Sequence, residues 1–244
     1  MPVGAATIET HRAAPHSSAV ELLRKQPCTA NQIHVLYSDG SEASPLGIAK
    51  TLLEGGSYDP MGKLGMIKLG GAVLYRRLLE DLEAKGYQVV FHEHAKVSEL
   101  FSVLGDPRTA GVLHAGHGIM HPDTVNDPVP RVALGFEGDD GARVGVHEAR
   151  ISQHKALNPD WKPSPALRFF ATDACNGGYA LGYYRTALGL SESTRLVGAY
   201  ENHTDRSIRR QLETFVAPIL EGLPSLRPGA PDRFERAPRP NPYC

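Results

Sequence analysis

The chain has 244 residues, of which 41% are hydrophobic and 22% charged, and its formal net charge at pH 7 is −1. These values are typical of an ordinary globular protein with a substantial core. The near-neutral charge, with no visible basic excess, argues against nucleic acid as the main partner. No apolar run approaches the ~20 residues that a membrane-spanning helix needs, so we expect no membrane partner.

The cysteines and the two ends of the chain bear on its compartment and domain organisation. Cys28, Cys175 and Cys244 are too few and too scattered for a disulfide framework, which favours a reducing compartment. The first residues lack the basic-then-apolar pattern of a secretory signal, so we expect a cytoplasmic protein, while secretion by a route without a signal peptide stays open. We expect an N-terminal extension over 1–30, a folded domain over 31–225, and a proline-rich tail over 226–244 that is extended or disordered.

Strand-like and helix-like segments alternate through the first half of the predicted domain. A buried strand is predicted over 32–38, followed by a helix that starts at Ser44-Pro45 with a capping serine and a first-turn proline. Leucines spaced by four residues predict a helix over 71–85, which ends at a glycine. A strand over 87–92, a short helix over 97–104 and a strand over 110–117 follow.

The second half continues the alternation after a long irregular segment over 119–165. Within that segment, residues 135–151 predict a small hairpin followed by a helix. A strand is predicted over 166–175, a helix over 178–188 and a strand over 194–200. A last long helix is predicted to be capped by Thr204 and to kink or weaken at Pro218.

Apolar strands alternating with amphipathic helices predict an α/β fold, a three-layer α-β-α sandwich with a mainly parallel sheet. Such sheets place functional residues on the loops at the carboxyl ends of their strands. In this chain that rule selects four places, which are Asp39, residues 92–94, residues 114–121 and residues 173–178.

Cys175 and His117 stand at two of these strand ends. A thiol at a strand-to-helix turn gains from the positive end of the helix, which favours the thiolate. We expect the following Gly177 and Gly178 to let a substrate backbone approach and to leave backbone N–H groups free for an oxyanion. If the two strands are parallel neighbours, His117 emerges beside Cys175 and can accept the thiol proton as general base, while Gly118 offers a second oxyanion donor.

The two motifs together resemble those of the caspase-like cysteine peptidases, nearest the metacaspase and CHAT-domain branches. HAGHG (114–118) is similar to the His-Gly block of that family, and DACNGG (173–178) is similar to its Asp-x-Cys-x-Ser-Gly block. The resemblance implies a caspase-hemoglobinase-like fold and a His117–Cys175 dyad that needs no cofactor and acts on peptide or protein substrates. It also implies an oxyanion hole formed by the N–H groups of Gly118 and Cys175.

The resemblance further implies a substrate pocket. Asp173 matches an acid that lines the pocket for a basic side chain in metacaspases, Asp39 is a reasonable match for a second one, and Ala115 replaces a pocket serine. Two carboxylates there would favour cleavage after Arg or Lys. An ordinary role for Asp173, as a helix-capping or turn residue, remains an equal alternative.

Two other functions stay open at this point. The spacing of His92 with His94 and of His114 with His117, together with His121, can bind zinc in a zinc-dependent hydrolase. A caspase-like fold can also serve as a non-catalytic binding module. Catalytically inactive relatives usually lose the histidine or the cysteine, and both are present here, which favours an enzyme.

Overall fold

The computed structural model describes residues 30–38, 44–124, 127, 129–138, 140–202 and 208–226. Cys28, Asp39, Thr204 and Cys244 lie outside these residues, as do most of the predicted N-terminal extension and C-terminal tail. Within the described part of the chain, no helix combines the length and the apolar character that crossing a membrane requires.

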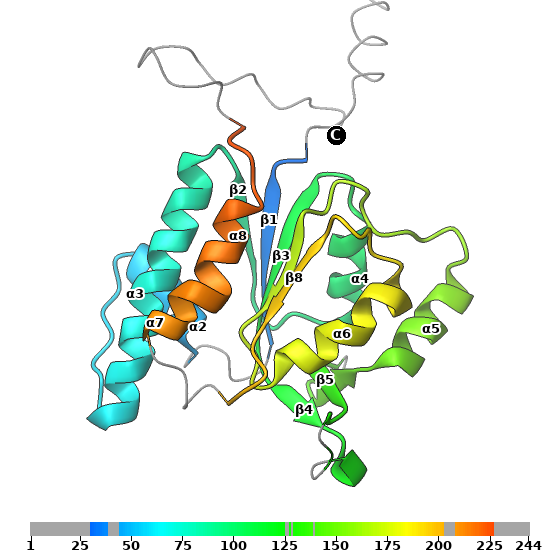
Figure 1. The fold of residues 1–244 in the computed structure, drawn as a ribbon, viewed down its shortest axis with the longest axis horizontal. Coiled ribbons are helices and arrows are strands. Elements are labelled where there is room, and N and C mark those ends of the chain that lie inside the picture. The colour runs from blue at the N-terminus through cyan, green and yellow to red at the C-terminus, as the bar shows by residue number, and fades with distance from the viewer. Residues whose placement is uncertain are drawn as a thin grey trace, which may run out of the picture. The chain divides into compact units, whose positions relative to one another are not determined.

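A five-stranded sheet with the order β2-β1-β3-β7-β8 forms the centre of the fold (Figure 1). Every neighbouring pair in it is parallel. Its strands are short and mostly buried, as expected of a sheet covered on both faces. They are β1 (Gln32–Tyr37), β2 (Gln88–His92), β3 (Thr109–Ala115), β7 (Phe169–Thr172) and β8 (Arg195–Gly198).

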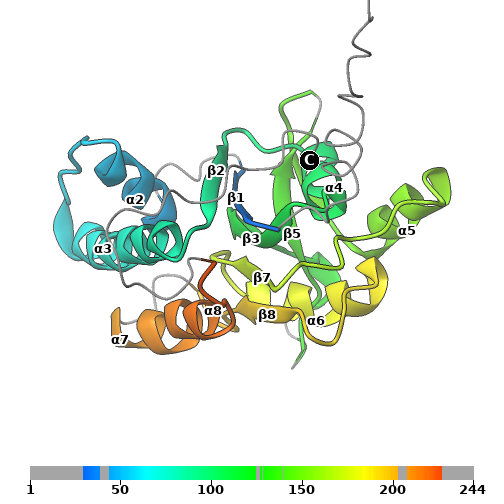
Figure 2. The same cartoon turned by 90° about the horizontal axis from the view of Figure 1, so that it is seen from above.

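Helices cover both faces of this sheet, which gives three layers (Figure 2). One face carries α2 (Pro45–Leu53), α3 (Gly62–Ala84), α7 (Ile208–Gln211), the π-helical turn η4 (Leu212–Val216) and α8 (Ala217–Glu221). The other carries α4 (Val97–Gly105), α5 (Glu148–Leu157) and α6 (Gly177–Leu188). The α/β class, the mainly parallel sheet and the three-layer arrangement predicted from the sequence are therefore confirmed.

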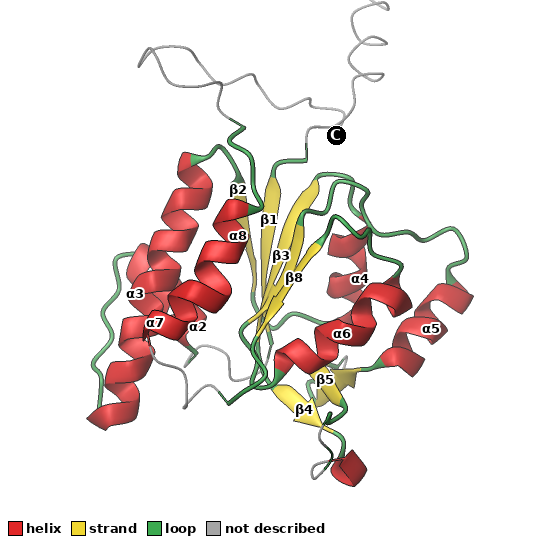
Figure 3. Cartoon of the chain, viewed as in Figure 1, coloured by secondary structure: helices red, strands yellow, loops and turns green. Residues whose placement is uncertain are grey.

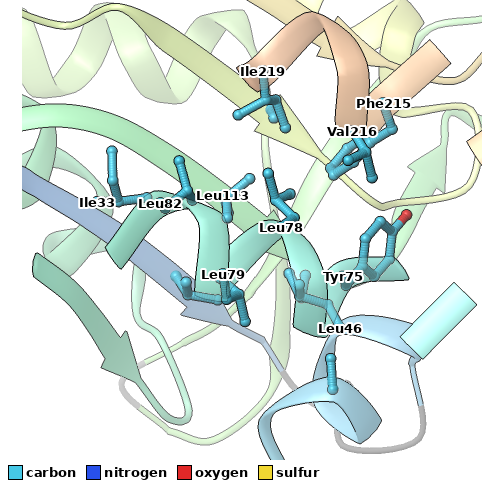
Figure 4. Packing of buried hydrophobic residues seen from close by; sticks show 14 of the residues in the cluster. Ile33, Leu46, Tyr75, Leu78, Leu79, Leu82, Leu113, Phe215, Val216 and Ile219 are labelled. Carbon is cyan, nitrogen blue, oxygen red and sulfur yellow. The ribbon is translucent and has the colours of Figure 1, made fainter. Parts of the chain in front are cut away.

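Alternation along the strands builds a separate apolar core on each face. Ile33, Val35 and Tyr37 of β1 point to one side, where they pack with residues of α2, α3 and the last helices. Figure 4 shows Leu78 and Leu82 of α3 in this cluster, among side chains from several other elements. The alternate positions of the strands, whose side chains point to the other face, form the second core with α4, α5 and α6. The strand ends are thus held in place from both sides.

A second, smaller sheet lies beyond the carboxyl ends of the strands (Figure 3). It is antiparallel, with the order β4-β5-β6, and contains β4 (Gly118–Met120), β5 (Val132–Glu137) and β6 (Arg143–Val146). The short turn η2 (Pro122–Thr124) follows β4. The hydroxyl of Tyr183 donates to the Val132 carbonyl at 2.9 Å, and that of Tyr184 to the Val146 carbonyl at 2.6 Å. Both tyrosines belong to α6, so this helix is fastened to the small sheet.

Most predicted elements form where the sequence places them, and the differences have physical causes. Ser44 caps α2 by accepting the Gly47 N–H, as predicted. The predicted helix over 71–85 is instead α3, which begins nine residues earlier at Gly62. The last long helix is broken by the π-helical turn directly before α8, whose second residue is Pro218. Proline lacks an N–H and clashes with the carbonyl four residues back, which explains the irregular turn.

Candidate active site

The register of β3 and β7 brings the strand ends that precede the two predicted catalytic residues to the same level. These strands pair in parallel with His114 opposite Thr172, and the Asp173 N–H donates to the His114 carbonyl at 2.9 Å. The offset between paired residues is therefore 58. His117 and Cys175 are separated by the same number of positions in the sequence. Both follow closely on the ends of adjacent strands, as the parallel-sheet argument predicts.

The backbones of the two motifs touch directly. A Cβ atom placed on Gly118 would overlap the carbonyl oxygen of Cys175, so only glycine fits at this contact. His117 is exposed, whereas Cys175 is half-buried and is a free thiol. The structure thus brings the His-Gly motif and the cysteine turn together at the carboxyl edge of the sheet, with the imidazole open to solvent.

Beneath this edge, His114 is fully buried and joins the two strands. Its Nε2 lies 2.9 Å from the Gly135 carbonyl oxygen and must donate to it, since a carbonyl only accepts. In a neutral imidazole Nδ1 is then an acceptor, which takes the Thr172 hydroxyl at 2.9 Å. Burial lowers the pKa of His114 to about 4, so it is neutral at pH 7. The Thr172 oxygen in turn accepts the Ala174 N–H at 3.1 Å. His114 is therefore a structural support for the turn that carries Cys175.

The depressed pKa of His114 makes stability fall in acid. In the unfolded chain an imidazole titrates near its ordinary pKa of about 6.5, so below that pH the unfolded state binds more protons. The contribution of His114 to the free energy of unfolding is present above the ordinary pKa of about 6.5 and is lost progressively as the pH falls towards 4. Between pH 7.5 and 5 we expect a loss of about 2 kcal/mol from this group. Urea unfolding at the two pH values measures it.

A replacement separates this contribution from that of other groups. His114→Asn should be less stable than the wild type at pH 7.5, but its stability should fall less between pH 7.5 and 5. Burial and the neighbouring His92 also lower the pKa of His34 to about 4, so part of the acid loss remains in the variant. An equal fall in both proteins would contradict the assignment of His114.

Cys175 lies in a strand-to-helix turn of unusual backbone conformation. Asn176, the N-cap of α6, has φ 55°, in the left-handed region. The predicted strand over 166–175 is accordingly shorter, because β7 ends at Thr172 and the chain turns before it reaches Cys175. The thiol therefore directly precedes the N-terminus of a 12-residue helix, as the sequence predicts.

The expectation that the N–H groups of Gly177 and Gly178 are free is wrong. The Gly177 N–H donates to the Ala174 carbonyl at 3.1 Å, and the Gly178 N–H donates to the Ala199 carbonyl at 2.8 Å. These bonds close the turn and attach it to the segment after β8. These two N–H groups are therefore not available to an oxyanion.

Gly118 has a backbone N–H that the pairing of β4 with β5 leaves unused. In the pairing of β4 with β5, the Gly135 N–H donates to the His117 carbonyl and the His121 N–H donates to the Arg131 carbonyl. Antiparallel pairs alternate, so Gly118, opposite Leu134, is in a non-hydrogen-bonded pair. Its N–H points away from β5 and is not used by this ladder. The predicted role of the Cys175 N–H stays a prediction.

The three predicted substrate-binding residues have different positions. Asp173 is only 2% exposed and its Oδ1 accepts the Tyr75 hydroxyl of α3 at 2.7 Å. Ala115 is fully buried in the core, so its methyl group has no access to solvent. Asp39 lies outside the described residues. Asp173 thus has a fixed orientation, set by a helix that the sequence does not link to it.

The histidines of the zinc alternative do not converge. Among the residues that the structure describes, no group of three or more His, Cys, Asp or Glu side chains could hold a metal ion. Each of the other histidines has a separate partner: His92 pairs with His34 at 2.9 Å, His94 with Glu137 at 3.0 Å, and His121 lies 3.6 Å from Asp123. The spacing in the sequence is misleading here because β2 ends at His92 and β3 ends at Ala115, so the two histidines of each motif do not lie on one strand.

No protein-family model and no curated protein matches the chain. The chemistry of this site is therefore read from its own residues. It combines a half-buried thiol at a helix N-terminus, an exposed imidazole on the neighbouring strand end, and a backbone N–H directed away from its ladder. A nucleophile, a base and an oxyanion donor are what acyl transfer requires.

Sequence reasoning missed three residues of this site. The sequence motif gives Asn176 no role, although asparagine is enriched among the non-glycine residues in the left-handed region. The histidine spacing gives His114 as a possible metal ligand, whereas its position inside an apolar strand is typical of a buried structural residue. Tyr75 lies on the buried face of α3, and no sequence pattern connects it to Asp173.

Proposed function

We propose that the protein is a cysteine endopeptidase of the caspase-like type, acting through a His117–Cys175 dyad. The observation that carries the proposal is the contact of Gly118 with the Cys175 carbonyl, which joins the two motifs at one sheet edge. Support also comes from the parallel order of β1, β3, β7 and β8 and from the small antiparallel sheet that follows His117. The fold and the motif pair are both consistent with the family that the sequence resembles.

In the proposed reaction, His117 accepts the thiol proton and the Cys175 sulfur attacks the carbonyl carbon of the scissile peptide. The resulting oxyanion accepts hydrogen bonds from the N–H groups of Gly118 and Cys175. When the C–N bond breaks, the proton passes from His117 to the leaving amine, which leaves a thioester on Cys175. Water then attacks the thioester after giving a proton to His117, and the acid product leaves as the thiol is restored.

Asp173 is the proposed determinant of the residue before the cleaved bond. Its carboxylate is buried and hydrogen-bonded to Tyr75, so a substrate side chain would contact it only after the residues that cover it move. A guanidinium or ammonium group of the substrate would supply charge-assisted hydrogen bonds to this carboxylate. A neutral side chain at the same place would form no ion pair with Asp173, and an acidic one would be repelled by it.

The test uses fluorogenic peptides that end in Arg, Lys, Asp or a neutral residue. We expect the wild type to cleave the Arg and Lys peptides, and Asp173→Asn to lose kcat/KM on them by about 100-fold, equivalent to about 3 kcal/mol. Tyr75→Phe keeps the charge and loses one hydrogen bond, so a smaller loss of about 10-fold is expected. If the wild type cleaves none of these peptides, the peptidase proposal fails. If it cleaves but Asp173→Asn keeps its preference for Arg, only the role of Asp173 fails.

A further inference from the structure

Asn176, the residue after the proposed nucleophile, has a backbone conformation that non-glycine residues rarely adopt. It and His94 are the two non-glycine residues with positive φ in the described part of the chain. A left-handed residue between a strand and a helix reverses the chain sharply, so it decides where the preceding side chain emerges. Glycine would adopt this conformation without strain, yet the chain has an asparagine, whose side chain can also form hydrogen bonds.

The Asn176 side chain contacts both neighbours of the turn. Its Nδ2 donates to Asn202 Oδ1 at 3.0 Å and lies 3.9 Å from the Met120 sulfur, while its backbone N–H donates to the Glu201 carbonyl at 3.1 Å. Met120 belongs to β4, the strand that begins directly after His117. One side chain thus links the cysteine turn to β4, the strand that follows His117, and to the segment after β8.

The segment after β8 is itself held in place by contacts with α7 and α6. The Glu201 carboxylate pairs with Arg210 of α7 at 2.8 Å. The ring of Tyr200 meets that of Tyr179 edge-on, with 4.9 Å between their centroids. A displacement of Asn176 would therefore have to break contacts on several sides.

We propose that Asn176 is a positioning residue, which holds Cys175 against His117 by tying its turn to Asn202 and Met120. This inference rests on the proposed dyad and adds a residue that the resemblance does not supply. Asn176 does not touch the reacting atoms and acts through the backbone of its neighbour. Because a misplacement of about 1 Å can cost about 100-fold in rate, loss of the amide should slow the chemistry without weakening substrate binding.

One glycine and one alanine variant of Asn176, with an alanine variant of Asn202, separate the effect of the amide from that of the backbone conformation. Asn176→Gly keeps the left-handed turn and removes the amide, Asn176→Ala removes the amide and strains the turn, and Asn202→Ala removes the partner from an exposed position. Asn158→Ala, at the exposed end of α5, is the matched control. Mass spectrometry follows iodoacetamide alkylation of Cys175 between pH 5 and 9, with Cys28 and Cys244 as internal references. Thermal melts confirm that each variant is folded.

We expect Cys175 to react about 10-fold more slowly in Asn176→Gly and in Asn202→Ala, and slower still in Asn176→Ala, with Asn158→Ala unchanged. On a cleaved peptide, kcat should fall in the same order while KM stays within about two-fold. Unchanged or faster alkylation in both Asn176→Gly and Asn202→Ala would overturn the inference. If the wild type cleaves no peptide, the proposed function fails, whereas the alkylation rates still decide whether Asn176 positions the thiol.

Discussion

Cys175→Ala is expected to reduce peptide hydrolysis by about 10,000-fold or more, because no other thiol in the described chain can form the acyl intermediate. His117→Ala should reduce kcat by about 100- to 10,000-fold through loss of the general base. Residues that act as one unit are strongly non-additive, so the double variant should be no worse than Cys175→Ala alone. Initial rates on the best cleaved peptide measure all three.

A nearby histidine provides the control for this prediction. His121→Ala alters an exposed imidazole three residues beyond the motif and should leave kcat within about two-fold of the wild type. Cleavage by Cys175→Ala at the wild-type rate would contradict the dyad. Additive losses in the double variant would show that the two residues act independently.

Gly118→Ala is expected to lower both stability and activity, although it adds a single methyl group. The added carbon would overlap the Cys175 carbonyl oxygen, which belongs to the backbone and cannot turn aside as a side chain can. Relief requires the two motifs to separate, at a cost of about 1–3 kcal/mol in unfolding free energy. Because the separation is between the proposed base and nucleophile, kcat/KM should fall by about 100-fold.

Gly182→Ala is the matched control for the added methyl group. Gly182 lies in the middle of α6, and a Cβ there would meet nothing within 4 Å. Alanine should therefore stabilise the protein by about 0.5–1 kcal/mol through helix propensity, without changing kcat/KM. Urea unfolding and peptide hydrolysis of both variants test the contrast, and full activity of Gly118→Ala would show that the motifs need not be in contact.

The sheet and its helices follow from local sequence signals. Apolar runs such as 110–117 and the leucine spacing of α3 reflect burial of strands on two faces and of a helix on one, which periodicity reports directly. The hairpin of β5 and β6 and the helix after it are also predicted. These features depend on residues close together in the chain.

The missed features depend on contacts between distant residues. β4 has only three residues and forms because β5 pairs with it, so no local sequence pattern predicts it. The bond from Tyr75 to Asp173 joins residues 98 positions apart. The bonds that occupy the Gly177 and Gly178 N–H groups likewise depend on how the turn closes and where the segment after β8 lies. The sequence predicts which motifs meet, whereas the hydrogen bonds that orient them require the folded chain.

Covalent labelling tests the central claim most directly. The wild type, Cys175→Ala and His117→Ala are each treated with a peptidyl-arginine chloromethyl ketone, and peptide mapping by mass spectrometry locates the adduct. The account predicts rapid modification of Cys175 alone in the wild type, with Cys28 and Cys244 unmodified, and a rate at least about 100-fold lower in His117→Ala. Equal modification of all three cysteines, or an undiminished rate in His117→Ala, would contradict the His117–Cys175 dyad.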